Sequence, residues 1–233
     1  CMNRLWQLKQ TLPQNLKENR KYSNKIEFVL VNFVKDKEGE EIDNYVRNTF
    51  KNEIKSGYLK YYVTKELKSW NASIAKNTSH NYATGKLLYN LDCDNFVINK
   101  EVEQILDSYR NSDNYLYFGW SDTWKDGTAG RVCTTNKQFR EVNGYNQNFE
   151  GTGYEDLDLL RRVESKYNLT IEKPKGFVNK AIQNDKDEGI QNIDNSKKWK
   201  TMERNNANTS KKNIKNKIYK SNHSLRVVAF KVE

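Results

Sequence analysis

Short apolar runs alternate with helical segments over the first half of the chain. Residues 26–33, 59–63 and 86–91 are the apolar runs, and their length and composition are typical of buried strands. Residues 40–54, with apolar side chains at three- and four-residue spacing, and residues 71–84 are predicted helices. Strands that alternate with helices in this way predict an α/β fold with a Rossmann-like, mostly parallel central sheet flanked by helices.

Two aspartates lie where such a sheet places its chemistry. Asp92 and Asp94 follow directly on the apolar run, and open α/β sheets bind ligands beyond the carboxyl ends of their strands. Since side chains alternate with a period of two along an extended chain, both carboxylates can leave on the same side. Two such oxygens suit a hard divalent cation, with phosphate oxygens completing its shell. A solvated turn is the alternative interpretation of the same pair.

A second acidic cluster follows a glycine-rich entry to a helix. Gly153 and Tyr154 precede Glu155 and Asp156, and Asp158 lies two positions after Asp156. The helix dipole alone favours acidic residues here, but it does not explain the glycines or the aromatic residue. A carboxylate in this place can accept a proton from an attacking hydroxyl. Adjacent helical side chains diverge by about 100°, so we expect Glu155 and Asp156 to take different roles.

Several enzyme classes lack their signatures in this sequence. There is no Gly-x-Ser-x-Gly elbow, no phosphate-binding Gly-x-x-x-x-Gly-Lys loop and no Gly-x-Gly-x-x-Gly. His80 and His223 have no evident triad partner, and the three cysteines have no metal-type spacing. Serine hydrolases, common nucleotide triphosphatases and dinucleotide enzymes are therefore disfavoured. A reducing, cytoplasmic compartment is expected from the cysteine usage.

The positive charge is concentrated near the carboxyl end. Of the net charge of +10, residues 195–233 contribute +9, with 11 basic and 2 acidic side chains. We therefore predict a catalytic domain over residues 1–194 and a basic extension over 195–233 that ends in a short strand. Such an extension can make peripheral contact with an anionic membrane, and a solvated charged face is the alternative. A nearly neutral body disfavours nucleic acid as a partner.

Four blocks, in order over about residues 1–165, together resemble glycosyltransferase family 2, which has the GT-A fold. Each block is weak alone, and the ordered set carries the resemblance. The last block is also similar to a galactosyltransferase C-terminal region. The blocks are Met2-Asn3-Arg4 with Leu8 and Thr11-Leu12; Ala75-Lys76-Asn77 with Ala83 and Gly85; Leu91-Asp92-Cys93-Asp94-Asn95; and Phe139, Asn143-Gly144-Tyr145 with residues 153–159.

The resemblance implies transfer of a sugar from a nucleotide-sugar donor, usually a UDP-sugar, to a glycan or other hydroxyl acceptor. It implies a divalent metal, Mn²⁺ or Mg²⁺, bound at Asp94, with Asp92 on the ribose or in the metal shell. Asp156 would be the general base, Glu155 would orient the acceptor, and one in-line displacement would invert the anomeric carbon. The donor-binding residues would include Asn77 and Asn32, and Tyr154 and Gly153 would contact the acceptor.

The sequence departs from the family pattern in three places. The family opens with a strand ahead of its first helix, so the resemblance implies that this first strand is truncated here. The acidic pair of the family's second strand is replaced by Asn32 and Asp36. The family's metal-binding histidine is replaced by Asn184 or Asp185.

Two other functions fit parts of the same pattern. A nucleotidyltransferase of similar layout would also use paired aspartates and a metal, but it would release pyrophosphate rather than a nucleoside diphosphate. A basic nucleic-acid-binding protein is the third hypothesis, and it requires a basic groove across the folded body.

Overall fold

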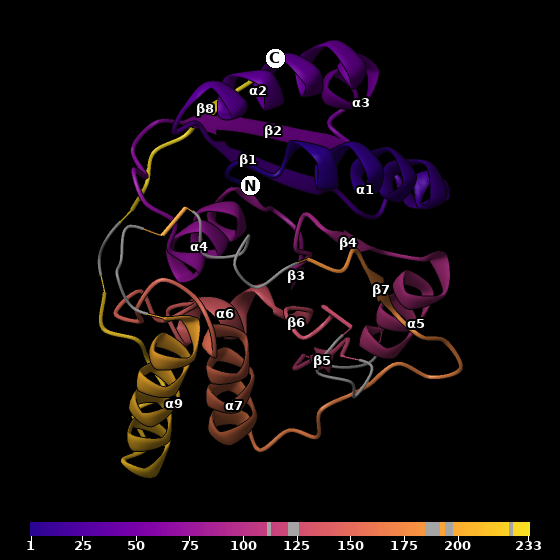
Figure 1. Ribbon diagram of the computed structural model, residues 1–233. Coiled ribbons are helices and arrows are strands. Elements are labelled where there is room, and N and C mark those ends of the chain that lie inside the picture. Colours follow the sequence, from indigo (N-terminus) through magenta and orange to yellow (C-terminus); the bar gives the residue numbers. More distant parts are fainter. Residues whose placement is uncertain (111–112, 121–125, 185–191, 194–197, 224–225) are drawn as a thin grey trace.

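A computed structural model describes residues 1–110, 113–120, 126–184, 192–193, 198–223 and 226–233. The first half of the chain folds as a helix-covered sheet (Figure 1). Its helices are α1 (Leu5–Glu18), α2 (Lys37–Thr49), α3 (Lys51–Lys55) and α4 (Ala72–Tyr82), with a short 3-10 turn, η1 (Arg20–Tyr22). Its strands β1 (Phe28–Phe33) and β2 (Leu59–Thr64) pair in parallel, from Phe28 opposite Leu59 to Phe33 opposite Thr64.

Helices cover both faces of this sheet. Leu8, Leu12 and Leu16 of α1 pack with α2 and β2 in one apolar cluster, and α1 continues through Pro13. Ala75 of α4 packs against Val31 and Phe33 of β1 in another cluster on the opposite face. Apart from Asn32, β1 is apolar because helices cover both of its faces, as is typical of parallel strands.

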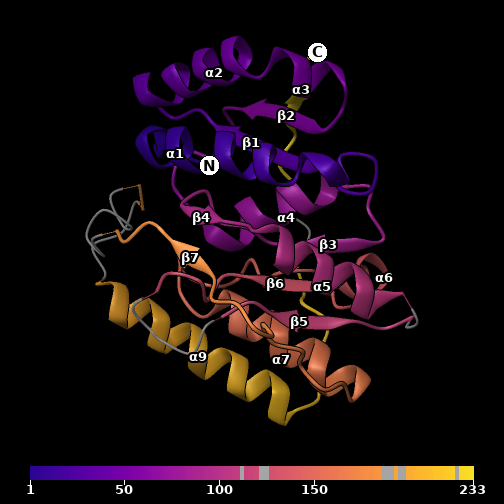
Figure 2. The same cartoon turned by 90° about the vertical axis from the view of Figure 1, so that its right-hand side faces the viewer.

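The strands that follow α4 pair in antiparallel fashion. The strands β3 (Leu87–Tyr89), β6 (Val132–Thr135) and β5 (Leu116–Phe118) form one sheet in that spatial order, and β4 (Asn95–Phe96) pairs with β7 (Lys180–Ala181). Helices α5 (Asn99–Tyr109), α6 (Asn136–Glu141) and α7 (Glu155–Tyr167) surround them. Figure 2 shows these elements below the β1–β2 layer. The parallel pairing that we predicted is therefore confirmed for β1 and β2, while the other described ladders are antiparallel.

The basic carboxyl-terminal segment packs on the rest of the protein. Helix α9 (Trp199–Lys215) lies along α7, with Met202 fully buried (Figure 2). Strand β8 (Phe230–Lys231) adds to β2 in antiparallel fashion, and Val232 enters the α1–α2 cluster. The domain boundary at residue 194 stays a prediction, but the described part of 195–233 is no detached tail. Nor is any helix in the described ranges long and apolar enough to cross a membrane.

Candidate active site

The two acidic clusters converge on one buried lysine. Lys76 comes from α4, and its Nζ lies 3.0 Å from Glu155 Oε1 and 2.7 and 2.6 Å from the two carboxylate oxygens of Asp156. The same Nζ lies 3.7 Å from Asp92 Oδ1, on the segment that follows β3. The side chain of Lys76 is only 9% exposed. Three carboxylates around this buried ammonium hold the pKa of Lys76 well above its usual range, against the opposing effect of burial.

Glu155 and Asp156 share one partner in this structure, and their expected difference in role stays a prediction. Both residues lie in the first turn of α7, but their carboxylates reach the same ammonium. The reason is that Lys76 projects from α4 to the amino end of α7, where it contacts both side chains at once. Lys76 lies in the Ala75-Lys76-Asn77 motif, but no pattern in the sequence assigns a function to its side chain.

The carboxyl group of Asp156 is buried among charged side chains. Burial raises the pKa of its carboxyl well above the usual range, Glu155 and Asp92 add to the rise, and Lys76 opposes it. Glu155 is 5% exposed, and its Oε2 has no hydrogen-bond partner among the described residues. An unpartnered buried carboxylate oxygen is unfavourable, and a ligand hydroxyl would satisfy it.

Asp94 is held by two amides. Asn95 Nδ2 donates to Asp94 Oδ1 at 2.7 Å, and Asn184 Nδ2 donates to Asp94 Oδ2 at 2.5 Å. Asn184 is itself fixed by Gln7 of α1, whose Nε2 donates to Asn184 Oδ1 at 3.1 Å. Burial, with the charge of Asp92, raises the pKa of Asp94. Asn184 was one of the two predicted replacements for a metal-binding histidine, and the other, Asp185, lies outside the described residues.

A polar stripe on α1 supports the loop that carries Asp94. Thr11 Oγ1 donates to the carbonyl oxygen of Cys93 at 2.6 Å, and Asn15 Nδ2 donates to that of Asn95 at 2.9 Å. Asn19 Nδ2 donates to the carbonyl oxygen of Val97 at 2.9 Å. Together with Gln7, these residues recur at every fourth position of the sequence, which places them on one helix face. This four-residue spacing is visible in the sequence.

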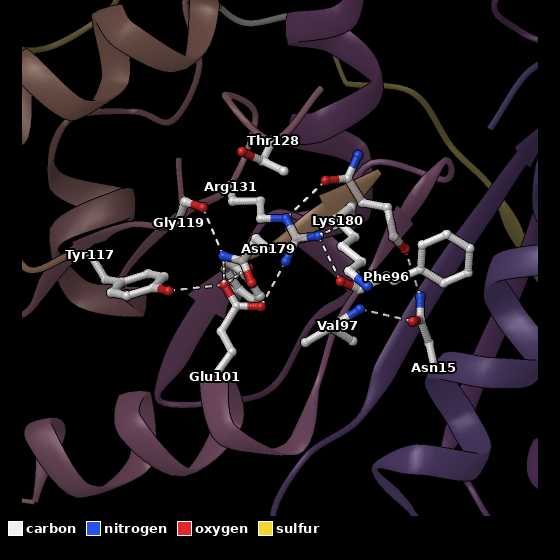
Figure 3. A network of polar contacts seen from close by, with 12 residues as sticks. Asn15, Phe96, Val97, Glu101, Tyr117, Gly119, Thr128, Arg131, Asn179 and Lys180 are labelled. Carbon is white, nitrogen blue, oxygen red and sulfur yellow. Dashed lines mark hydrogen bonds and ion pairs between the residues drawn. The ribbon is translucent and has the colours of Figure 1, made fainter. Parts of the chain in front are cut away.

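Behind this loop lies a fully buried ion pair (Figure 3). Arg131 Nη1 lies 2.7 Å from Glu101 Oε2, and both side chains have 0% exposure. Arg131 Nε donates to Asn95 Oδ1 at 2.8 Å, and its Nη2 donates to the carbonyl oxygens of Phe96 and Lys180. Arg131 thereby fixes the amide of Asn95, which in turn fixes Asp94. Sequence analysis gave no role to Arg131 or Glu101, because the pair is 30 residues apart in sequence.

Glycines let the backbone approach the acidic groups. A Cβ on Gly130 would lie 2.2 Å from Asp92 Oδ2 and 3.5 Å from Asp156 Oδ2, so this residue lies between the two clusters. Gly153 has a φ of +95° and Tyr154 a φ of +72°, both left-handed. Their strained turn is held by Asn206 of α9, whose Nδ2 donates to the carbonyl oxygen of Gly153 at 2.8 Å. Gly153 and Tyr154 are half-buried and lead directly into Glu155.

Asn77 and Asn32, which were predicted to contact the sugar donor, form hydrogen bonds within the fold. Asn77 Nδ2 donates to the carbonyl oxygen of Tyr145, and the amide of Tyr145 donates to Asn77 Oδ1, each at 2.8 Å. Asn32 is fully buried on β1, and its Nδ2 donates to the carbonyl oxygen of Gly39 at 2.8 Å. Asn32 thus ties β1 to α2 on the face away from the acidic clusters, and Asn77 ties α4 to the segment before α7. These hydrogen bonds give both amides a role within the fold, and donor contact stays a prediction for both residues.

The carboxylates present fit a divalent cation that is shared with a substrate. No group of three His, Cys, Asp or Glu side chains able to hold a metal occurs in the described part of the chain. Asp92 and Asp94 offer two carboxylates, and Asp92 is the more open of the two, with its side chain 38% exposed. Mg²⁺ and similar hard cations are commonly bound by one or two carboxylates together with substrate phosphates, so the pair is sufficient.

A cavity of about 890 Å³ adjoins these groups. Its lining includes Lys76, Asp92, Asp94 and Glu155, together with residues of β1 and β3. A space of this size is in the range that holds small ligands in proteins.

Comparison with known proteins identifies the fold and a segment that resembles a known family. Residues 114–185 match the family model described as the N-terminal domain of galactosyltransferase. This match contains the acidic start of α7 and confirms the galactosyltransferase resemblance of the segment, so the chain carries a glycosyltransferase-like domain. No curated protein matches the sequence.

Three solved structures resemble the chain. A mannosyltransferase from Pyrobaculum calidifontis, solved with GDP-Man and Mn²⁺, has a TM-score of 0.61 at 12% identity over 77% of this chain and 54% of its own. Drosophila β1,4-galactosyltransferase 7 with xylobiose has a TM-score of 0.48 at 13% identity over 86% and 82% of the two chains. A further structure of it, with manganese, UDP-Gal and xylobiose, has a TM-score of 0.48 at 14% identity over 84% and 80%.

The structural similarity to the mannosyltransferase establishes the GT-A fold that we predicted from the sequence. The chain spans about half the length of that protein.

Proposed function

We propose that this chain is a metal-dependent, inverting glycosyltransferase that moves a sugar from a UDP-sugar to a hydroxyl of a glycan or related acceptor. The observation that carries the proposal is that Lys76 contacts Glu155 and Asp156 at the start of a helix and lies 3.7 Å from Asp92, one of the two aspartates that follow a strand. A pair that suits a cation and a diphosphate therefore faces a pair that suits a hydroxyl. The GT-A fold and the galactosyltransferase-like segment support the same reaction.

Asp94 and Asp92 form the donor side of the proposed site. They would hold Mn²⁺ or Mg²⁺, which when bound supplies positive charge against the negative charge that grows on the leaving diphosphate. The hydrogen bonds from Asn95 and Asn184 keep the carboxylate of Asp94 oriented without substrate. Gly130 leaves room beside Asp92, where any larger side chain would collide with that carboxylate.

Asp156 acts on the acceptor side. Its carboxylate takes the proton of the acceptor hydroxyl while that oxygen forms a bond to the anomeric carbon. The bond from the anomeric carbon to the diphosphate oxygen breaks, and its electron pair leaves with the nucleoside diphosphate. A single displacement of this kind inverts the anomeric centre. The free Oε2 of Glu155 accepts a hydrogen bond from the acceptor, and Gly153 and Tyr154 border the same space.

Thermal unfolding with UDP, with and without Mn²⁺, tests the donor site. We expect UDP with Mn²⁺ to raise the melting temperature of the parent protein, because a ligand at 100 times its Kd stabilises the folded state by about 2.7 kcal/mol. Asp94→Ala should lose this rise. Asp107→Ala, at an exposed position on α5, is the control and should keep it.

Two outcomes would contradict the proposal. An unchanged response of Asp94→Ala to UDP and Mn²⁺ would remove Asp94 from the donor site. Release of pyrophosphate, rather than a nucleoside diphosphate, during turnover would identify a nucleotidyltransferase instead.

A further inference from the structure

The turn that leads into α7 has a strained backbone. Tyr154 has a φ of +72°, and Gly151 and Gly153 before it have φ values of +45° and +95°. A bulky residue such as tyrosine rarely adopts this left-handed region. Strain of this kind persists only where the surrounding structure holds it in place, and it is concentrated at functional sites. The contacts of residues 150–154 therefore show which parts of the protein hold this turn.

A single buried side chain of α9 binds both ends of the turn. Asn206 Oδ1 accepts a hydrogen bond from the backbone amide of Glu150 at 2.9 Å. Asn206 Nδ2 donates to the carbonyl oxygens of Glu150 at 3.0 Å and Gly153 at 2.8 Å. Asn206 is only 2% exposed. A side-chain amide can both accept and donate hydrogen bonds, and Asn206 directs its oxygen and its nitrogen to the same turn.

The amino end of α4 binds this turn as well. The backbone amide of Ala72 donates to the carbonyl oxygen of Gly151 at 2.8 Å, and Asn71 Nδ2 donates to that of Phe149 at 3.0 Å. A Cβ on Gly151 would lie 2.9 Å from Met202 Sδ, so α9 packs directly against the backbone here. Figures 1 and 2 show α9 beside α7, the helix that follows the turn. Two helices far apart in sequence, α4 and α9, thus fix the turn.

The acidic residues at the start of α7 follow this turn directly. Glu155 and Asp156 are the first two residues of the helix, and Tyr154 is the residue before it. Among the described residues, the side chain of Tyr154 makes no capping hydrogen bond to α7. The position of the first helical turn therefore depends on residues 150–154 and on the contacts with Lys76. A shift of the turn would move both carboxylates together.

We propose that Asn206 is a positioning residue for sugar transfer: by holding residues 150–153 it keeps Glu155 and Asp156 beside Lys76, directed at the acceptor hydroxyl. This inference rests on the proposed function. It makes α9 a support of the acceptor side, although the sequence placed this helix in a basic extension. A displacement of about 1 Å at a catalytic group can cost about 10²-fold in rate, so one buried amide can have a large effect on turnover.

The donor side has supports of its own. Asp94 is oriented by the amides of Asn95 and Asn184, and neither of these lies in α9 or in residues 150–154. Loss of the Asn206 amide should therefore disturb the acceptor side and leave the donor side in place. This difference separates a positioning role from a general loss of folding.

The magnetic resonance signal of the Lys76 ammonium tests the support without any ligand. In protein with isotope-labelled lysine, Lys76→Met assigns the signal by removing it. We expect Asn206→Ala to shift or broaden this signal, because Glu155 and Asp156 move relative to the ammonium. Exchange of the backbone amide hydrogen of Glu150 should become at least about tenfold faster, since its acceptor is lost. Asn208→Ala, at an exposed position of the same helix, is the matched control and should change neither.

Turnover tests the consequence for the reaction. UDP released from UDP-galactose is measured with water as the acceptor, so that no particular glycan is required. We expect Asn206→Ala to lower kcat at least about tenfold and to leave the donor KM within about twofold. Asn206→Ser keeps one hydrogen-bond donor and should lose less. Ile42→Ala, in the distant α1–α2 cluster, controls for lost stability and should keep the parent kcat at a temperature where it is folded.

Three results would overturn the proposal. An unchanged Lys76 signal in Asn206→Ala would show that the amide does not hold the two carboxylates. Equal loss of kcat in Asn206→Ala and Ile42→Ala would assign the effect to stability alone. A changed signal with the parent kcat would show that the turn does not position the reaction. A parent that releases no UDP, with the expected change of the Lys76 signal in Asn206→Ala, would instead contradict the proposed function, and the role of Asn206 in transfer would fall with it.

Discussion

At the level of single residues, the ammonium group of Lys76 compensates the buried charge of the acidic cluster. Glu155 and Asp156 each lie within 3.0 Å of Lys76 Nζ, in surroundings that would otherwise disfavour two carboxylates. Breaking a buried ion pair by removal of one partner costs about 3–5 kcal/mol, because the remaining charge is left uncompensated. An exposed pair contributes about 0–1 kcal/mol.

We therefore expect Lys76→Met to lower the free energy of unfolding by about 3–5 kcal/mol at pH 7, as measured by urea denaturation. Lys21→Met removes an exposed partner of Glu103 and is the matched control, with an expected change of at most about 1 kcal/mol. The loss in Lys76→Met should shrink at low pH, where the carboxylates are protonated. Similar small losses in both variants would show that Lys76 does not compensate the acidic cluster.

Packing between helices α4 and α6 includes a buried histidine. His80 near the end of α4 stacks on Phe139 of α6, with ring centroids 4.8 Å apart, and its Nδ1 lies 2.7 Å from the carbonyl oxygen of Lys76. Burial lowers the pKa of His80 to about 4, from an ordinary value of 6.5. The folded protein therefore holds His80 neutral at pH values where the unfolded chain binds a proton.

This difference predicts a stability loss on acidification. The stabilisation is complete above about pH 6.5 and is lost as the pH falls toward 4, by about 3 kcal/mol in total. The measurement is urea unfolding from pH 7 to 4 for the parent and for His80→Phe, which keeps an aromatic ring but cannot titrate. We expect the parent's advantage over the variant to fall by about 3 kcal/mol across this range. A constant difference would mean that His80 does not titrate in this way.

The elements differ in how far the sequence could predict them. The β1 and β2 strands and the leucine face of α1 were predictable, because their apolar patterns reflect burial in the same elements. The predicted helix 40–54 is divided into α2 and α3 at Phe50, whose backbone leaves the helical region while its ring is buried. Tertiary packing decided that break, and no local pattern marks it.

The residues of the candidate site also differ in how far the sequence could predict them. Asp92, Asp94, Glu155 and Asp156 stand beside strand and glycine signals in the sequence, and the structure brings Asp92, Glu155 and Asp156 to Lys76. Their supports, Arg131, Glu101 and Asn206, come from distant segments, so only the folded chain reveals them. Asn77 and Asn32 were assigned through resemblance alone, and their amides are used within the fold.

At the scale of the whole molecule, basic side chains gather at the carboxyl end of α9. Lys211, Lys212, Lys215, Lys217 and Lys220 are exposed there, while Met202 and Asn206 of the same helix are buried against the body. Deletion of residues 195–233 would therefore remove packing as well as charge. Substitution of the exposed lysines separates the two effects.

We expect the protein to bind vesicles that contain phosphatidylserine at low salt, and to lose this binding when four of these lysines, at 211, 212, 215 and 217, are changed to glutamine. Sedimentation with vesicles at low ionic strength and at 0.5 M salt measures the effect, since salt screens exposed charges. The melting temperature should stay near that of the parent. Equal binding by parent and variant at low salt would contradict a role for this surface.

We propose that Asp156 removes the proton of the acceptor hydroxyl. The direct measurement is the rate of sugar transfer by Asp156→Asn, with donor binding measured on the same variant. We predict near-native donor affinity and a loss of at least about 10²-fold in rate, because asparagine keeps the shape but cannot take the proton. Asp107→Asn, at an exposed position on α5, should transfer at the parent rate. Transfer by Asp156→Asn at the parent rate would contradict the account and make Glu155 the next candidate base.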